Sequence, residues 1–168
     1  MIEISKVRSE RDINAVAVLV WEFFDHLRTR YDERLDDIDG YILSKNVAGE
    51  LDDFATYFNP PAGEALLARK DGVPVGIVMM RPAANGAAEM NRMYVTDAAR
   101  GFGVGRQLAQ HLISEARALG YSMMILDAWD RHQEALPLYE SVGFKRYIDT
   151  DLAPKGMVAT AIQMRMSL

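Results

Sequence analysis

Arg100-Gly101-Phe102-Gly103-Val104-Gly105-Arg106, which we call the glycine segment, lies between an apolar strand-like run that ends at Val95 and an amphipathic helix-like run over 104–119. Its glycines leave backbone N–H groups at the mouth of the helix without Cβ atoms to crowd an approaching anion. The positive end of the helix dipole adds to the attraction. The spacing therefore predicts a phosphate-binding loop, with a tight strand-to-helix connection as the alternative.

Composition places the chain among single-domain globular proteins. A chain of 168 residues can bury about two thirds of the surface that it would expose when unfolded, so we expect one domain over 1–168. Cysteine is absent, no apolar run is long enough to cross a bilayer, and the first residues lack the pattern of a secretory signal. We therefore expect a soluble cytoplasmic protein that does not bind a membrane.

The net charge of -5 argues against a nucleic-acid partner, since binding to phosphate backbones depends on clustered Lys and Arg. The acidity is concentrated in one segment. Residues 22–64 hold eleven acidic and four basic residues. Two interpretations of this acidic segment stay open: solvated helix faces and loops, or an acidic rim that steers a cationic acceptor.

Hydrophobic periodicity predicts a mixed α/β fold with helices on both faces of a sheet. Ser9 and Asp12 form a helix-capping pattern, Asp71-Gly72 is a type I′ hairpin signal, and Gly120 fits a helix end. We predict strands over 2–7, 64–70, 73–81, 87–95, 121–126, 144–148 and 157–166. We predict one helix from near Ser9 to near Arg28 and a second that follows a cap at Asp39 and carries Tyr41, Val47, Leu51 and Phe54. Two further helices are predicted over 104–119 and 133–142.

Two motifs in a fixed order resemble a known family. Arg-x-x-Gly-x-Gly, at Arg100, Gly103 and Gly105, follows a strand, and about thirty residues later comes Ala-Leu-Pro-Leu-Tyr-Glu-Ser-Val-Gly-Phe over 135–144. Residues 64–148 resemble the GNAT superfamily of acyl-CoA-dependent N-acyltransferases. The resemblance implies a mostly antiparallel sheet of about seven strands flanked by about four helices. It also implies an acetyltransferase that uses acetyl-CoA, without a metal, on a primary amine of a small molecule or peptide. Homodimers are common in this superfamily.

The resemblance also implies a coenzyme site. In the family, pyrophosphate oxygens accept hydrogen bonds from backbone N–H groups at the positions of 102–106 here, and pantetheine pairs with the strand at 93–95. The family commonly has Asn where this chain has His132. The residues that we expect to bind the coenzyme are Met93, Tyr94, Val95, Arg100, Gly101, Phe102, Gly103, Val104, Gly105, Arg106, His132 and Tyr139.

Tyr139 is the predicted general acid, because the family places a Tyr beside the thioester sulfur. A phenol with a pKa near 10 is protonated at neutral pH and can donate to a thiolate whose conjugate acid has a pKa near 8.5. Glu89 is the predicted base, since many members carry a carboxylate at this strand position, often acting through water. Asp127, His132 and His111 are rivals by their chemistry.

Two other functions remain open. Gly101-x-Gly103 resembles the start of a dinucleotide-binding fingerprint, although Arg106 stands where its third glycine should be. A non-catalytic acyl-CoA-binding domain would keep the fold without turnover. No His or carboxylate spacing indicates a metal site.

Overall fold

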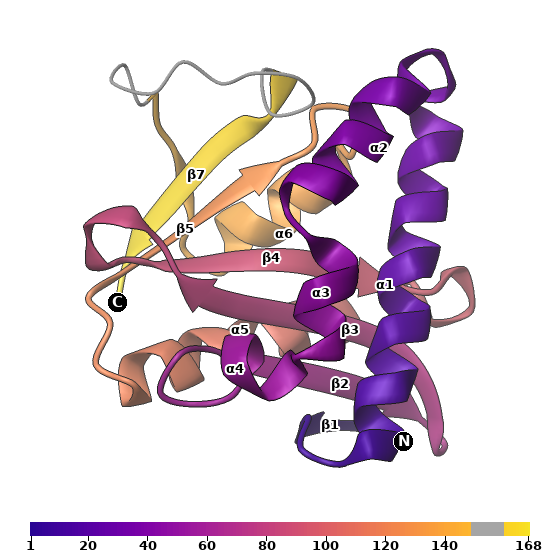
Figure 1. The fold of residues 1–168 in the computed structure, drawn as a ribbon. Coiled ribbons are helices and arrows are strands. Elements are labelled where there is room, and N and C mark those ends of the chain that lie inside the picture. The colour runs from indigo at the N-terminus through magenta and orange to yellow at the C-terminus, as the bar shows by residue number, and fades with distance from the viewer. Residues whose placement is uncertain (149–159) are drawn as a thin grey trace.

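A computed structural model of the chain describes residues 1–148 and 160–168 (Figure 1). Within these residues it holds seven strands and six α-helices. In chain order they are β1 (Ile2–Lys6), α1 (Glu10–Arg30), α2 (Leu35–Ser44), α3 (Val47–Asp52), α4 (Phe54–Phe58), β2 (Glu64–Lys70), β3 (Val73–Pro82), β4 (Ala88–Val95), α5 (Val104–Ala118), β5 (Met123–Ala128), α6 (Ala135–Ser141), β6 (Lys145–Arg146) and β7 (Ile162–Ser167). Short 3₁₀ helices cover Asp32–Arg34, Ala84–Gly86 and Asp97–Ala99.

All seven strands belong to one sheet in the order β1-β2-β3-β4-β5-β7-β6. Every neighbouring pair is antiparallel except β4 and β5, which are parallel. The prediction of a mostly antiparallel sheet of about seven strands is confirmed.

Helices cover both faces of this sheet, as predicted. On one face, α5 packs its buried stripe of Leu108, Leu112 and Ala116 against the sheet, and Leu136 of α6 extends the same core. On the other face, α1 to α4 build a second core with aromatic residues such as Phe24. Figure 1 shows α1 and α2 on the viewer's side of the sheet and α5 behind it.

Three local signals in the sequence act as expected. The Ser9 side chain accepts a hydrogen bond from the Asp12 backbone N–H at 3.1 Å and caps α1. Asp71 and Gly72 both have positive φ, 52° and 82°, as a type I′ turn requires. The N–H of Gly120 donates to the Arg117 carbonyl at the end of α5.

The predicted second helix was wrong in its extent. Asp39 lies inside α2 and does not cap it, and the chain forms three short helices where one was expected. Asn46 adopts a left-handed φ of 49° between α2 and α3, and this conformation ends a right-handed helix. The count of about four helices therefore becomes six within the described residues.

The C-terminal boundaries also differ from the prediction. β5 lies two residues later than expected, and β6 has only two residues. The predicted strand over 157–166 begins outside the described residues, and its described part is β7. Among the described residues, no helix combines the length and the apolar character needed to cross a membrane.

Candidate active site

The site is organised by the divergence of β4 and β5. These strands pair only at Ala88 with Met124 and at Glu89 with Ile125, and beyond that point they separate (Figure 1). The pairing of β4 with β3 also shifts register near Arg92, whose φ is 50°, which marks a bulge. Among the described residues, the backbone of β4 from 90 to 95 therefore has no neighbouring strand on the side of β5.

The glycine segment lies at the start of α5, beyond the open end of this gap. Gly101 and Gly103 have φ values of 81° and 74°, which glycine adopts without strain. Within the described part of the chain, no side chain caps α5, and Gln107 is the first residue of this helix whose N–H reaches a carbonyl, that of Gly103. The N–H groups ahead of it are available to an anion at the positive end of the helix.

The other residues of the glycine segment differ in exposure. Val104 is buried in the core and Arg106 is exposed. A Cβ on Gly105 would lie 3.1 Å from a Leu138 methyl, so this glycine allows α5 and α6 to pack closely. Phe102 is exposed, with the Lys70 ammonium 3.6 Å from its ring centre.

Arg100 and the predicted strand residues line the sides of the gap. Arg100 donates to the Val95 carbonyl at 3.3 Å and pairs with Asp97 at 2.8 Å. Met93 and Val95 pack toward the α5 core. Tyr94 points to the other face, where its hydroxyl lies 3.4 Å from a Glu22 oxygen.

Tyr139 and Met93 line a narrow cavity of about 40 Å³ between the separating strands, together with His132. The Tyr139 ring is buried and meets Phe144 edge to face. Its hydroxyl has no hydrogen-bond partner within the described part of the chain, and burial raises the Tyr139 pKa above its ordinary value. The phenol is therefore protonated at neutral pH.

His132 is held between β5 and α6. Its backbone N–H donates to the Trp129 carbonyl at 2.9 Å, and its own carbonyl accepts from Ala135. The Nε2 nitrogen is buried without a partner among the described residues. Burial, followed by the nearby Arg30, lowers the His132 pKa to about 4, so the imidazole is neutral at pH 7.

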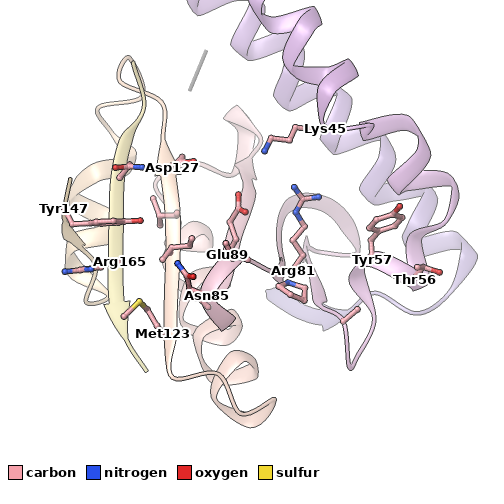
Figure 2. A pocket seen from close by; sticks show the side chains of 18 residues that line it. Lys45, Thr56, Tyr57, Arg81, Asn85, Glu89, Met123, Asp127, Tyr147 and Arg165 are labelled. Carbon is pink, nitrogen blue, oxygen red and sulfur yellow. The ribbon is translucent and has the colours of Figure 1, made fainter. Parts of the chain in front are cut away.

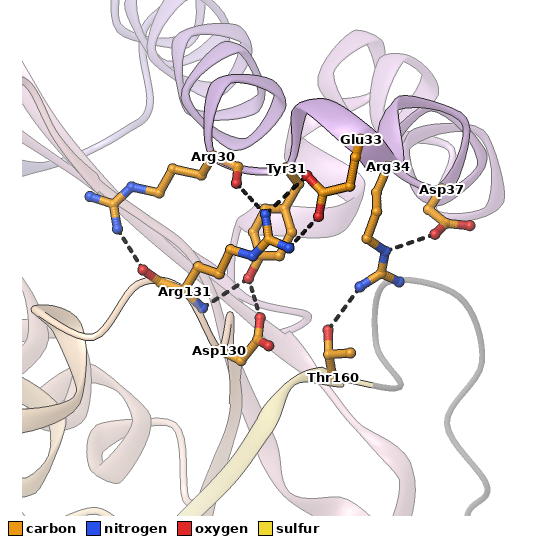
Figure 3. A network of polar contacts seen from close by, with 8 residues as sticks. All are labelled: Arg30, Tyr31, Glu33, Arg34, Asp37, Asp130, Arg131 and Thr160. Carbon is orange, nitrogen blue, oxygen red and sulfur yellow. Dashed lines mark hydrogen bonds and ion pairs between the residues drawn. The ribbon is translucent and has the colours of Figure 1, made fainter.

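A network at the end of α1 anchors the loop that carries His132 (Figure 3). The buried Tyr31 hydroxyl donates to the Asp130 carboxylate and accepts from the Arg131 backbone N–H at 2.9 Å. The Arg131 guanidinium stacks 4.4 Å from the Tyr31 ring centre and donates to the Arg30 carbonyl. Arg30 in turn donates to the Arg131 carbonyl at 2.8 Å.

A larger cavity of about 660 Å³ opens on the other side of the β4 and β5 pairing. Figure 2 shows Lys45, at the end of α2, and Arg81, on β3, facing Glu89 on β4, with Asp127 on β5. Burial and then the Glu89 charge raise the pKa of Asp127, while Lys45 acts in the opposite direction. Arg165 lines the far side.

The predicted catalytic residues line two cavities that share Leu126 and Asp127. Glu89 lines the larger cavity and Tyr139 the narrow one, and Asp127 lines both. His111 is exposed on α5 and lines neither of these two cavities among the described residues.

Sequence reasoning missed a buried charge cluster under the larger cavity. The Glu50 carboxylate is 2% exposed, and it accepts from Arg81 and, at 2.6 Å, from Arg92. Lys45 was missed as well. The only sequence signal was the alternation of β4, which places Arg92 on a buried face, where a charge needs a partner.

Among the described residues, no acidic side chain of the acidic segment lines the larger cavity. The described residues of the segment that line this cavity are Lys45, Thr56, Tyr57 and Ala62. Several of its acids pair with arginines: Arg28 with Asp25 and Asp39, Arg34 with Asp37, and Arg131 with Glu33. The contacts therefore match the interpretation of solvated, paired helix faces.

The fold and the site define the class of protein. The model of the GNAT family of acetyltransferases matches residues 19–144, so the chain belongs to this family. An uncharacterised N-acetyltransferase of Schizosaccharomyces pombe is 34% identical over 146 residues, which span 86% of this chain and 83% of that protein. The protein is an enzyme of the N-acetyltransferase class, and the dinucleotide-binding oxidoreductase is set aside.

Solved structures show the same fold. The PaiA N-acetyltransferase of Thermoplasma acidophilum, in complex with coenzyme A, has a TM-score of 0.75 at 19% identity, with 100% of this chain and 99% of that chain covered. A GNAT acetyltransferase of Staphylococcus aureus Mu50 has a TM-score of 0.71 at 18% identity, with 99% of each chain covered.

Proposed function

We propose that this enzyme transfers the acetyl group of acetyl-CoA to a primary amine of a small molecule or peptide, by direct attack of the neutral amine on the thioester. The observation that carries the proposal is the gap between β4 and β5. It has the uncapped start of α5 beyond one end and a cavity lined by carboxylates on its other side. The coenzyme-bound Thermoplasma neighbour supports the choice of donor.

The coenzyme would lie along this gap. Its pyrophosphate would accept hydrogen bonds from the N–H groups of 102–106, with Gly101 and Arg100 beside it. The pantetheine would extend the sheet along the β4 backbone at 93–95, which β5 leaves unpaired. The unpartnered Nε2 of His132 would supply the contact that Asn makes in the family. Such a fixed donor places the thioester a set distance from the phosphates, and this positioning can lower a barrier by several kcal/mol.

The reaction then forms one bond and breaks one bond. It also moves two protons, one away from the amine and one to the departing thiolate. The amine nitrogen forms a bond to the thioester carbonyl carbon, and the bond from carbon to sulfur breaks. Tyr139 donates its proton to the departing thiolate, and Glu89, directly or through water, takes the proton that the amine loses. Asp127 is the alternative base, because its raised pKa suits proton acceptance nearer neutral pH.

The test is release of free coenzyme A from acetyl-CoA across a panel of polyamines, amino acids, amino sugars and peptide amines. Tyr139→Phe should lower turnover about 100-fold, within the range for loss of a general acid, while coenzyme affinity stays within about twofold of wild type by the same reasoning. The substitution keeps the ring that packs on Phe144. Tyr121→Phe is the matched control, since its hydroxyl has no hydrogen-bond partner among the described residues.

The outcomes separate the functions. Wild-type turnover in Tyr139→Phe would remove its role as the acid. Binding of acetyl-CoA without turnover on any acceptor would favour the non-catalytic acyl-CoA-binding domain. Location in the cytoplasm and a homodimeric state stay predictions, to be checked by cell fractionation and by light scattering.

A further inference from the structure

A small subsite adjoins the larger cavity and extends it toward α1 and α2. Its volume is about 70 Å³, which exceeds the ~10–15 Å³ that one water molecule needs, so it admits a group of a few atoms. It shares Lys45, Glu89 and Asp127 with the larger cavity, so the two spaces have a common wall. We call it the zwitterion subsite, and it is lined by Phe23, Tyr41, Lys45, Glu89, Met90, Asn91, Arg92, Asp127 and Trp129.

Arg92, which like Asn91 lines both this subsite and the narrow cavity, supplies an unmatched donor. Its side chain is 5% exposed, and its Nη2 donates to Glu50 at 2.6 Å. Its Nη1 is buried with no hydrogen-bond partner in the described part of the chain. A buried guanidinium nitrogen without an acceptor is unfavourable, and an oxygen of a bound molecule would satisfy it.

Asn91 gives the same subsite an unmatched acceptor. Its Oδ1 is buried and also lacks a partner among the described residues. A donor on the bound molecule would satisfy it. The subsite is therefore complementary to a molecule that carries both an anionic oxygen and an N–H group.

The charges around the subsite lead to the same requirement. Glu50 offsets only one of the two guanidinium groups of Arg81 and Arg92, so that cluster carries a net charge of +1. Lys45 adds a second positive charge and has no carboxylate partner among the described residues, its ammonium lying 5.8 Å from the Tyr41 ring centre. Glu89 and Asp127 supply two negative charges at the common wall.

Tyr41 adds a neutral donor to the positive side. Burial raises the pKa of its hydroxyl to about 12, and the charges of Arg92, Glu89, Arg81 and Asp127 all act on it. The phenol thus remains protonated at neutral pH and lies near both positively and negatively charged side chains. A zwitterion fits this arrangement better than a purely cationic amine.

We propose that the acceptor is an amine that carries a carboxylate, as an amino acid does, with the carboxylate held by Arg92, Lys45 and Tyr41 and the amine held near Glu89 and Asn91. This inference rests on the proposed function, because it names the substrate class of the same site. It places the amine beside the proposed base and at the divergence of β4 and β5.

The test compares amino acids with their carboxamides, which keep the shape and lose the negative charge, in the coenzyme A release assay. Rates are compared at equal concentrations of the free amine, since an amide lowers the pKa of the neighbouring amine. We expect kcat/KM for the acid to exceed that for the amide by about 10- to 100-fold, the range for loss of a hydrogen-bonded charge pair.

Lys45→Met is the diagnostic variant, because Lys45 is partly buried at the end of α2 and forms no ion pair among the described residues. It should bring the ratio of acid to amide close to one, mainly through KM for the acid. Lys6→Met, at the β1 edge of the sheet, removes a positive charge from a surface pair with Glu115 and should retain the wild-type ratio.

Calorimetric titration of the same acid and amide into the protein saturated with coenzyme A supplies a readout without turnover. Binding of the acid alone, weakened by Lys45→Met, supports the subsite even if acetyl transfer fails, and that failure would then count against the proposed function only. Equal rates or affinities for acid and amide, or a ratio unchanged by Lys45→Met, would overturn the subsite and leave the acetyltransferase standing.

Discussion

Tyr31→Phe tests whether the network at the end of α1 positions the coenzyme site. Tyr31 is 0% exposed, so the ring stays packed and only the hydroxyl is lost. Asp130 then loses a donor and the Arg131 N–H loses an acceptor. A hydrogen bond to a charged group contributes about 1.5–3 kcal/mol, and we expect a loss of about 2 kcal/mol in the free energy of unfolding.

The assay combines thermal unfolding with steady-state kinetics. For a domain of this size, about 1 kcal/mol corresponds to about 2–4 °C, so Tm should fall by about 4–8 °C. The loop from Trp129 to Glu134 carries His132 and leads into α6 with Tyr139. Its loosening should raise KM for acetyl-CoA several-fold and change kcat less. Tyr121→Phe is again the control. A Tm within about 1 °C of wild type, together with an unchanged KM for acetyl-CoA, would refute the positioning role.

Three further outcomes follow from single contacts. Glu50→Gln leaves Arg92 without its carboxylate and should lower the free energy of unfolding in urea by about 3 kcal/mol; a loss under about 1 kcal/mol would show that the cluster is solvated. The pKa of His132 is lowered to about 4 in the native protein. Between pH 6.5 and 4 the unfolded chain therefore binds a proton that the native protein does not, and the free energy of unfolding decreases as the pH is lowered through that window. His132→Gln should flatten this fall in urea midpoints at pH 7, 5.5 and 4.5, and parallel curves for the two proteins would contradict it. Gly103→Ala forces a side chain to φ 74° and should cost about 1 kcal/mol and weaken coenzyme binding in a thermal-shift titration, whereas Gly40→Ala, with open space around it on α2, should do neither.

The sequence predicted the sheet and the glycine-rich start of α5 because both depend on local patterns. The alternation in β4, the hairpin at Asp71-Gly72 and the amphipathic stripe of α5 each act over a few residues. The region from Leu35 to Phe58 was predicted poorly for the opposite reason. Its break at Asn46 is a left-handed backbone conformation that Asn tolerates, but Asn also occurs inside helices, so the residue alone does not mark the break. Local propensity cannot decide between one helix with a kink and several short ones.

The charge around the acceptor cavity could not be predicted from the sequence. The number of acidic residues in a segment does not say which of them face the cavity and which pair with distant arginines. The acidic segment looked like a source of attraction for cations, yet Glu50 turns inward to Arg92 and Glu33 pairs with Arg131, ninety-eight residues away. Those pairs offset part of the local excess of negative charge. What remains at the cavity is Lys45, which the segment contributes from the end of α2, opposite Glu89 on β4. The same segment therefore brings a positive charge to the cavity, and the proposed zwitterionic acceptor is the alternative to a cationic one that the acid and amide comparison tests.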